Sequence, residues 1–183
     1  MKNSISKKLF PRLQVRDISA LGLLMAITAL LAIYCTFRIG TLVKIPMKFI
    51  SVFITAVLYG PFYGGLVAAI GDILNCLLAP VGPFVPQITI MEFVSGFVFG
   101  LFFMKENLPK TEYAVRTILC VFVQLFIDLV VNTMMYTFWL GWFSTFWSAF
   151  LLRTPAAIIK LFLQILLLLA TYPLVKRLKK YRF

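Results

Sequence analysis

The residues of this sequence that could do chemistry are charged and polar side chains inside apolar stretches. Residues 151–173, LLRTPAAIIKLFLQILLLLATYP, contain Arg153, Lys160 and Gln164, which are seven and four residues apart and so share one helix face. A cation inside a membrane helix costs roughly 2.5–3.5 kcal/mol, so it faces a partner or a water-filled cavity. Two interpretations stay open. Either Lys160 pairs with a carboxylate while Arg153 reaches the membrane surface, or both form a positive floor for an anionic ligand.

A second polar face lies on the preceding apolar stretch. Its residues recur at intervals of four, which indicates a cavity or a polar seam between helices: Gln124, Asp128, Asn132 and Tyr136. Asp72 and Asn75 lie three residues apart on an earlier segment, and Glu92 lies on the next one. We expect these carboxylates and amides to share one cavity with the cations.

The composition places these groups in a membrane protein. The chain has 183 residues, of which 62% are hydrophobic and 13% are charged, and its formal net charge is +12. It contains no histidine and no GxxxxGK[ST] motif, which argues against a histidine-based enzyme and against ATP hydrolysis through a P-loop. The three cysteines, Cys35, Cys76 and Cys120, have the spacing of neither a zinc site nor a disulfide framework. We expect no catalytic activity, no metal, no cofactor and no nucleic-acid partner.

The apolar stretches predict an all-α integral membrane protein with six transmembrane helices. The predicted spans are residues 18–37, 49–59, 62–78, 88–104, 117–139 and 151–173. Gly40 and Pro46 mark a loop after the first span. Thr154 is the predicted N-cap of the last helix, with Pro155 in its first turn. Residues 140–150 form an aromatic loop before it, either an interfacial belt or a lid.

Charge predicts the domain organisation and the orientation. Residues 1–16 form a basic leader that anionic lipid of the bilayer attracts, residues 17–176 form the six-helix domain, and residues 177–183 form a basic tail. Asp17 is a candidate cap for the first span. Thirteen of the 18 basic residues lie in the leader, the connection 105–116 or residues 176–183, so both termini should be cytoplasmic. The other five are then on the outer side and favour an anionic ligand there: Arg38, Lys44, Lys48, Arg153 and Lys160.

Several segments resemble S components of energy-coupling factor (ECF) transporters. GPFYGGLVAAIGD, from Gly60 to Asp72, is similar to a pattern shared by many such components. APVGPFVP at 79–86, SGFVFGLF at 95–102 and LLRTPAAIIK at 151–160 resemble the folate branch of that family, FolT. The resemblance covers residues 17–176, and Glu92 departs from it.

The resemblance implies a vitamin-capturing subunit in a prokaryotic plasma membrane. Such subunits bind their substrate from outside, have no ATPase activity, and assemble with a transmembrane coupling protein (EcfT) and two ATPases (EcfA and EcfA′). A stripe of small residues on the first helix corresponds to the face that docks the coupling protein: Ser19, Gly22, Ala26 and Ala29.

For folate or a related anionic vitamin, roles follow from residue chemistry. Arg153 and Lys160 would bind a carboxylate or the ring carbonyl, and Lys48 and Arg38 would assist near the mouth. Candidates for polar contacts to a pterin ring are Asp72, Asn75, Asp128, Asn132 and Gln87. Candidates for stacking or gating, each of which could equally anchor the protein in the membrane, are Trp139, Trp142, Phe84 and Trp147.

Two alternatives remain at this stage. The chain could bind another vitamin of the pantothenate, biotin or riboflavin class, whereas thiamine is a cation and fits the five outer cations poorly. It could also be a stand-alone proton-coupled carrier, with Asp72, Asp128 and Glu92 as the relay.

Overall fold

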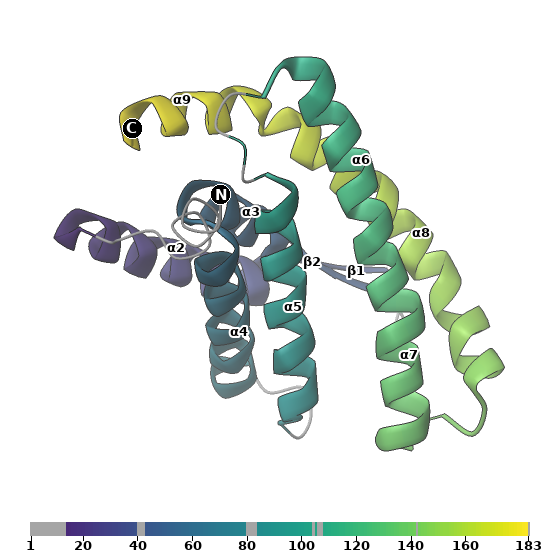
Figure 1. Cartoon of the computed structure of the whole chain (residues 1–183). Helices are drawn as coiled ribbons and strands as arrows, with labels where there is room; N and C mark the ends of the chain where they lie inside the picture. Colours follow the sequence, from purple (N-terminus) through teal and green to yellow (C-terminus); the bar gives the residue numbers. More distant parts are fainter. Residues whose placement is uncertain are drawn as a thin grey trace, which may run out of the picture.

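The computed structural model describes residues 14–39, 43–79, 84–103, 105, 108–141 and 143–182. Helices and one hairpin follow one another along the chain (Figure 1). Their bounds are α2 (Val15–Tyr34), β1 (Thr36–Ile39), β2 (Val43–Pro46), α3 (Phe49–Tyr59), α4 (Pro61–Leu78), α5 (Pro86–Phe102), α6 (Lys110–Phe126), the π-helical segment η1 (Ile127–Val131), α7 (Asn132–Met134), the π-helical segment η2 (Met135–Trp139), α8 (Phe146–Ala170) and α9 (Tyr172–Arg182).

Six apolar helical segments confirm the predicted membrane fold. Four are long and apolar enough to cross a bilayer: α2, α4, the continuous unit from α6 to η2, and α8. The other two, α3 and α5, are shorter, with 11 and 17 residues. At a rise of about 1.5 Å per residue, α3 spans only about 17 Å, so it is packed inside the bundle and does not cross the bilayer alone.

The connection after α2 is a hairpin where the sequence predicted a loop. β1 and β2 pair antiparallel, with Arg38 opposite Lys44. The pairing continues toward the helices, since the Met47 amide donates to the Cys35 carbonyl at 3.0 Å. Strand pairing satisfies backbone groups that an irregular loop at the membrane would leave without partners.

Three helix ends also differ from the prediction. The first helix begins at Val15, and Asp17 stabilises it from the third helical position, where its carboxylate accepts from the Gln14 amide at 3.0 Å in a capping box. The fifth span begins at Lys110, seven residues early, because Glu112 pairs with Arg116 one turn later and makes the charged connection helical.

The prediction that the last helix starts at Thr154 is wrong. α8 begins at Phe146 after the N-cap Thr145, so part of the predicted aromatic loop is helical and Pro155 lies inside the helix. The Thr154 hydroxyl donates to the Phe150 carbonyl at 2.7 Å. Pro155 has no N–H for the Leu151 carbonyl one turn earlier. Membrane helices tolerate such a proline because neighbouring helices, Ser or Thr side chains, ordered water and local adjustments satisfy the freed carbonyl.

Glycines pack α4 against α5. A Cβ at Gly100 would meet the Pro61 backbone, and a Cβ at Gly96 would meet the backbone of Gly64. Gly64 in turn lies against Ala56 of α3. The predicted GxxxG face of Gly96 and Gly100 is therefore a contact within the bundle, which allows the two helices to approach closely.

A cluster of buried aromatic rings lies beside the start of α9, where the ring centroids of Tyr113 and Tyr172 are 5.0 Å apart. The rings of Phe53, Phe99, Phe103 and Tyr113 meet edge to face at centroid distances of 4.9 to 6.5 Å. The Tyr113 hydroxyl donates to the Leu168 carbonyl of α8 at 3.0 Å. This cluster ties α3, α5, α6 and α8 together at one end of the molecule.

The predicted basic tail is also part of the folded bundle. α9 begins at Tyr172, Val175 is buried, and Lys179 donates to the Lys105 carbonyl at 2.9 Å. The predicted domain boundary at residue 176 therefore falls within a helix.

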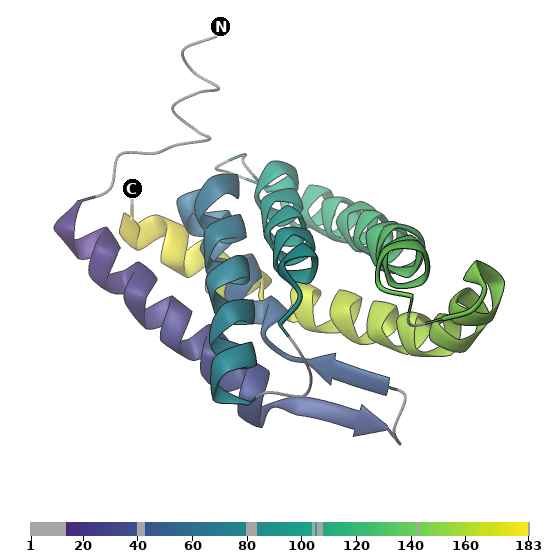
Figure 2. The ribbon, with the colours of Figure 1, turned by 90° about the horizontal axis from the view of Figure 1, so that it is seen from below.

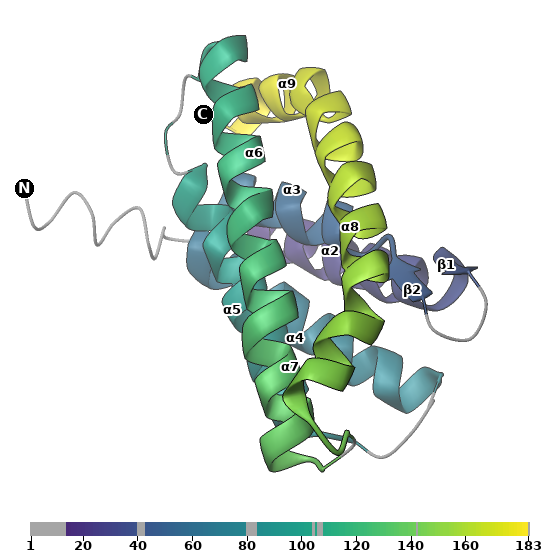
Figure 3. The same cartoon turned by 90° about the vertical axis from the view of Figure 1, so that its right-hand side faces the viewer.

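The helices form two groups. α2 to α5 pack on one another, with α2 on the side of α4 and α5 that faces away from α6 (Figure 2). The α6–α7 unit and α8 lie side by side along the length of the molecule (Figure 3). The polar residues singled out by the sequence lie where these two groups face each other.

Candidate ligand-binding cavity

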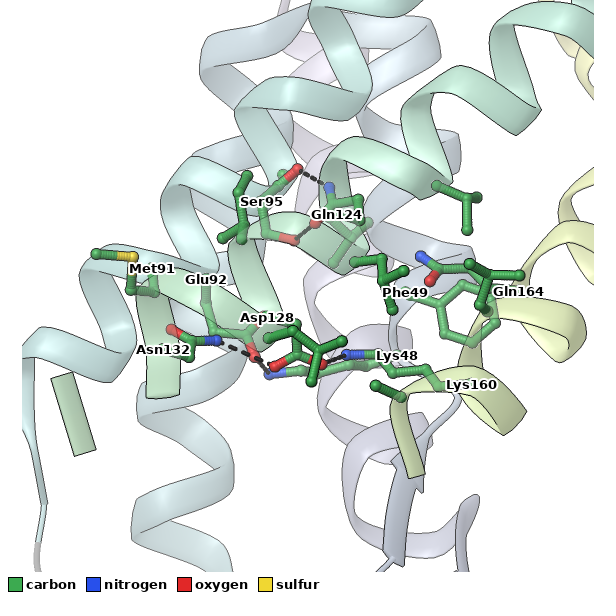
Figure 4. Close-up of a pocket in the computed structure, with 18 of the residues that line it drawn as sticks. Lys48, Phe49, Met91, Glu92, Ser95, Gln124, Asp128, Asn132, Lys160 and Gln164 are labelled. Atoms are coloured by element: carbon green, nitrogen blue, oxygen red, sulfur yellow. Dashed lines mark hydrogen bonds and ion pairs between the residues drawn. The ribbon is translucent and has the colours of Figure 1, made fainter. Parts of the chain in front are cut away.

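A cavity of about 440 Å³ lies between the two helix groups (Figure 4). It has the size expected for a small-molecule site. Its lining combines apolar side chains with charged and amide groups from α4, α5, α8 and the α6–η2 unit, and with Lys48 and Phe49 at the start of α3.

Asp128 holds two cations on one wall of the cavity. Its carboxylate accepts from Arg153 Nη2 at 3.0 Å and from Lys160 Nζ at 2.8 Å. Asn132 Nδ2 also donates to it at 3.2 Å. Arg153 is fixed further by a 2.8 Å bond to the Thr133 hydroxyl and by the Tyr136 ring, whose centroid is 4.7 Å from Cζ.

A second charge cluster surrounds Lys48. Its ammonium lies 3.0 Å from Glu92 Oε1 and 3.6 Å from Asp72 Oδ1. The Thr89 hydroxyl donates to the other oxygen of Asp72 at 2.8 Å. The Lys48 side chain is 8% exposed, so its charge is buried and depends on these carboxylates.

The two clusters differ in net charge. Arg153 and Lys160 share one carboxylate and leave an excess of one positive charge, whereas Lys48 faces two carboxylates and leaves an excess of one negative charge. Among the described residues, the three cations and three carboxylates of the lining therefore sum to zero. Arg153 and Lys160, which the sequence offered as a positive floor, lie on the cavity lining and are both paired with Asp128. The pairing of Lys160 with a carboxylate agrees with the simpler of the two interpretations of the sequence.

One polar oxygen in the lining has no partner. Asn132 Oδ1 is buried, and no described group donates a hydrogen bond to it. A buried acceptor without a donor costs about 1–3 kcal/mol, which a ligand N–H would recover.

The two π-helical segments explain why the polar stripe reaches the cavity intact. In a regular α-helix, residues four apart drift by about 40° around the axis, so a long stripe would turn away. A π turn contains more residues and rotates them in the opposite sense. Alternation of α and π turns therefore keeps all four stripe residues on the lining: Gln124, Asp128, Asn132 and Tyr136.

Gln124 also connects the two helix groups beside the cavity. Its amide donates to the Ser95 carbonyl at 2.7 Å, and its side-chain oxygen accepts from the Ser95 hydroxyl at 2.5 Å. This pair of bonds fixes α5 relative to α6.

The structure brings most of the predicted polar site residues together. Seven line the cavity: Lys48, Asp72, Asn75, Asp128, Asn132, Arg153 and Lys160. Gln87 does not line it. Arg38 lies in β1, but its side chain is outside the described residues, as is the whole of Trp142.

Three of the residues predicted to stack on the ligand or gate the cavity lie outside the cavity lining. Phe84, Trp139 and Trp147 are 51%, 73% and 67% exposed, and none lines the cavity. The rings that do line it are Phe49, Phe99 and Tyr136. Tyr136 was detectable from the polar stripe, whereas Phe49 and Phe99 lie in apolar runs and carried no sequence signal.

The stripe of small residues on α2 is divided. Ser19, Gly22 and Ala26 are exposed, and a side chain added at Gly22 would meet no atom within 4 Å. Ala29 is buried at 7% exposure and faces the bundle.

The carboxylates that a proton relay would use, Asp72, Glu92 and Asp128, are each paired with a cation.

Known proteins resemble this chain over most of its length. A family model described as "ECF-type riboflavin transporter, S component" matches residues 12–180. A protein named "Folate transporter FolT" from Clostridium novyi (strain NT) is 30% identical over 99 residues, which cover 54% of each chain. A protein of the same name from Leuconostoc mesenteroides subsp. mesenteroides is 27% identical over 114 residues, covering 62% of this chain and 59% of the relative. The matches thus span about half to three-fifths of these relatives.

The fold has a counterpart among solved structures. The crystal structure of FolT bound with folic acid matches 91% of this chain and 98% of the FolT chain, with a TM-score of 0.71 and 22% identity. That similarity supports the helix arrangement, and the family model covers nearly all residues. From the fold, the cavity and the match over residues 12–180, this chain belongs to the family of ECF-type transporter S components.

Proposed function

We propose that this chain is the substrate-binding subunit of an ECF importer that captures folate from the outer side of a prokaryotic plasma membrane. Delivery inward would require a coupling protein and two ATPases, EcfT, EcfA and EcfA′. The proposal is supported by the folate-transporter names of the relatives in C. novyi and L. mesenteroides. The observation that carries it is a cavity with two adjacent cations and an unpaired amide acceptor.

The lining groups match the chemistry of folate. A carboxylate of the ligand would bind Arg153 and Lys160, whose cluster has the excess positive charge. Asn132 Oδ1 would accept a ring N–H, and Phe49 and Tyr136 would contact the ring faces. Charge-assisted hydrogen bonds contribute about 1.5–3 kcal/mol each, so two or three of them with ring burial reach nanomolar affinity.

Riboflavin is the second candidate, and one observation favours it. The charges of the described lining residues sum to zero, which suits a neutral ring system at least as well as a dianion. The family model that matches the chain also carries riboflavin in its description.

A fluorescence titration of the purified protein with each vitamin separates the two candidates. We expect nanomolar quenching by folate, weakened at least about tenfold by Arg153→Ala or Lys160→Ala, since each removes one charge-assisted bond. Lys105→Ala is the matched control, because Lys105 is an exposed cation paired with Glu112 outside the cavity. If the protein does not bind folate at micromolar concentration but binds riboflavin with nanomolar affinity, riboflavin replaces folate as the proposed ligand.

The docking surface for the coupling protein is part of the same proposal. Ser19, Gly22 and Ala26 form an exposed strip of small residues that lets a partner helix approach closely. Ala29 is buried, so the strip is shorter than the predicted one. The leader 1–16 and the last turns of α9 would lie at the cytoplasmic surface, where anionic lipid attracts their basic residues.

A further inference from the structure

The two carboxylates that face Lys48 differ in their surroundings. Asp72 is 9% exposed at its side chain and accepts a 2.8 Å hydrogen bond from Thr89. Glu92 is 32% exposed, lines the cavity, and lies 3.0 Å from Lys48. Among the described groups, no other hydrogen bond or ion pair of Glu92 is seen. Asp72 is therefore fixed in the bundle, whereas Glu92 is held by Lys48 alone and borders the space that a ligand would occupy.

Charge balance makes one of these carboxylates surplus. Lys48 and Asp72 neutralise each other, so Glu92 provides the negative charge that brings the described part of the lining to zero. Without it the described part of the lining would have an excess of one positive charge. Lys48 and Glu92 both line the cavity, so the ion pair between them uses hydrogen-bonding capacity of Lys48 that a ligand could otherwise take.

We propose that Glu92 determines the charge selectivity of the cavity by occupying Lys48 and thereby disfavouring anionic forms of the ligand relative to neutral forms of the same ring. This inference rests on the proposed function, since it requires that the cavity takes a vitamin. An anionic group that reaches Lys48 must either displace Glu92 from it or remain close to a carboxylate of like charge. A neutral ring meets neither cost. Glu92 thus acts by repulsion, which is one of the two routes to specificity.

The test compares ligands that share a ring but differ in charge. One pair is folate and its dimethyl ester, which keeps the ring and the side chain without a free carboxylate. The other pair is riboflavin 5′-phosphate and riboflavin. Each is titrated into the wild type and into Glu92→Gln, which keeps the size of the side chain and an oxygen that accepts from Lys48.

We expect Glu92→Gln to raise the preference for the anionic member of the bound pair by about tenfold or more, the effect of one added charge-assisted hydrogen bond. The affinity for the neutral member should change less than about twofold. Lys48→Met in the Glu92→Gln background should abolish the raised preference for the anionic ligand, because the ammonium whose charge Glu92 neutralised is then absent. Glu112→Gln is the matched control, since Glu112 is also paired with cations but lies outside the cavity.

The outcomes separate the inference from the proposed function. Folate binding by the wild type supports the function whatever Glu92→Gln does. An unchanged preference in Glu92→Gln, or an equal loss for both members of a pair, would overturn the inference alone, and the equal loss would make Glu92 a direct ligand contact. If the wild type binds none of the four compounds, the proposed function and the inference both fail.

Discussion

Asp128→Asn is the sharpest test of the cavity as a structural unit. The substitution removes one negative charge and keeps the shape of the side chain. Arg153 and Lys160, now 3.0 and 2.8 Å from the carboxylate oxygens, would face each other across a neutral amide. The cluster of Asp128, Arg153 and Lys160 would then have an excess of two positive charges inside the membrane.

The expected cost follows from burial. Removing one partner of a buried ion pair costs about 3–5 kcal/mol. The side chains of Asp128, Arg153 and Lys160 are 22%, 23% and 35% exposed, so water in the cavity screens part of this, and we expect about 2–3 kcal/mol. For a chain of this length, each kcal/mol lowers Tm by about 2–4 °C, which gives a fall of about 4–12 °C.

The assay is thermal unfolding of the ligand-free protein in detergent, followed by circular dichroism. Glu112→Gln is the control, since Glu112 also contacts two cations but at the surface, and it should change Tm little. Lys160→Met added to Asp128→Asn should recover part of the loss, because it removes one unpaired cation. Equal Tm values for Asp128→Asn and Glu112→Gln, or a further fall with Lys160→Met, would refute the reasoning.

Three further substitutions test the packing of the bundle and the proposed docking surface. Gly100→Val should lower Tm by more than Gly22→Val. A side chain at position 100 would meet the Pro61 backbone, whereas a Cβ at position 22 would have no neighbouring atom within 4 Å. Equal Tm values for the two variants would contradict the close α4–α5 contact. Gly22→Val should instead reduce assembly with the coupling protein, measured by co-purification, and leave folate affinity unchanged. Gln124→Leu should cost about 1–3 kcal/mol, since it removes two hydrogen bonds between the buried Gln124 and the half-buried Ser95. A thermal melt equal to that of the wild type would show that the packing of α5 on α6 does not depend on these bonds.

Hydrophobic pattern and composition were sufficient for the fold class. Six apolar segments, punctuated by Gly60-Pro61 and the proline-rich turn before α5, gave the number and order of the helices, because the bilayer requires long apolar helices with internally paired backbones. Helix ends were less accurate. Pro155 suggested a start that lies inside α8, since a membrane helix tolerates a proline that would end a helix in water.

Residue types and their spacing also identified most of the polar lining. Charges are rare in membrane helices, so Asp72, Asp128, Arg153 and Lys160 were informative one by one. The aromatic contacts were not predictable in this way. Nineteen phenylalanines occur in the chain, and nothing in the pattern distinguishes Phe49, which lines the cavity, from Phe84, which is exposed.

The sequence by itself determined that this chain is a helical membrane protein with cations and carboxylates at membrane depth, because those properties depend on amino-acid composition and on the spacing of apolar and polar residues along the chain. Only the tertiary structure decided which charge meets which. Asp128 and Arg153 are 25 residues apart in the chain, and Lys48 and Glu92 are 44 apart, so no local pattern pairs them. Their pairing neutralises the charged side chains that the structure describes in the cavity lining, since ion pairing depends on distances of a few ångströms that only the packed helices fix.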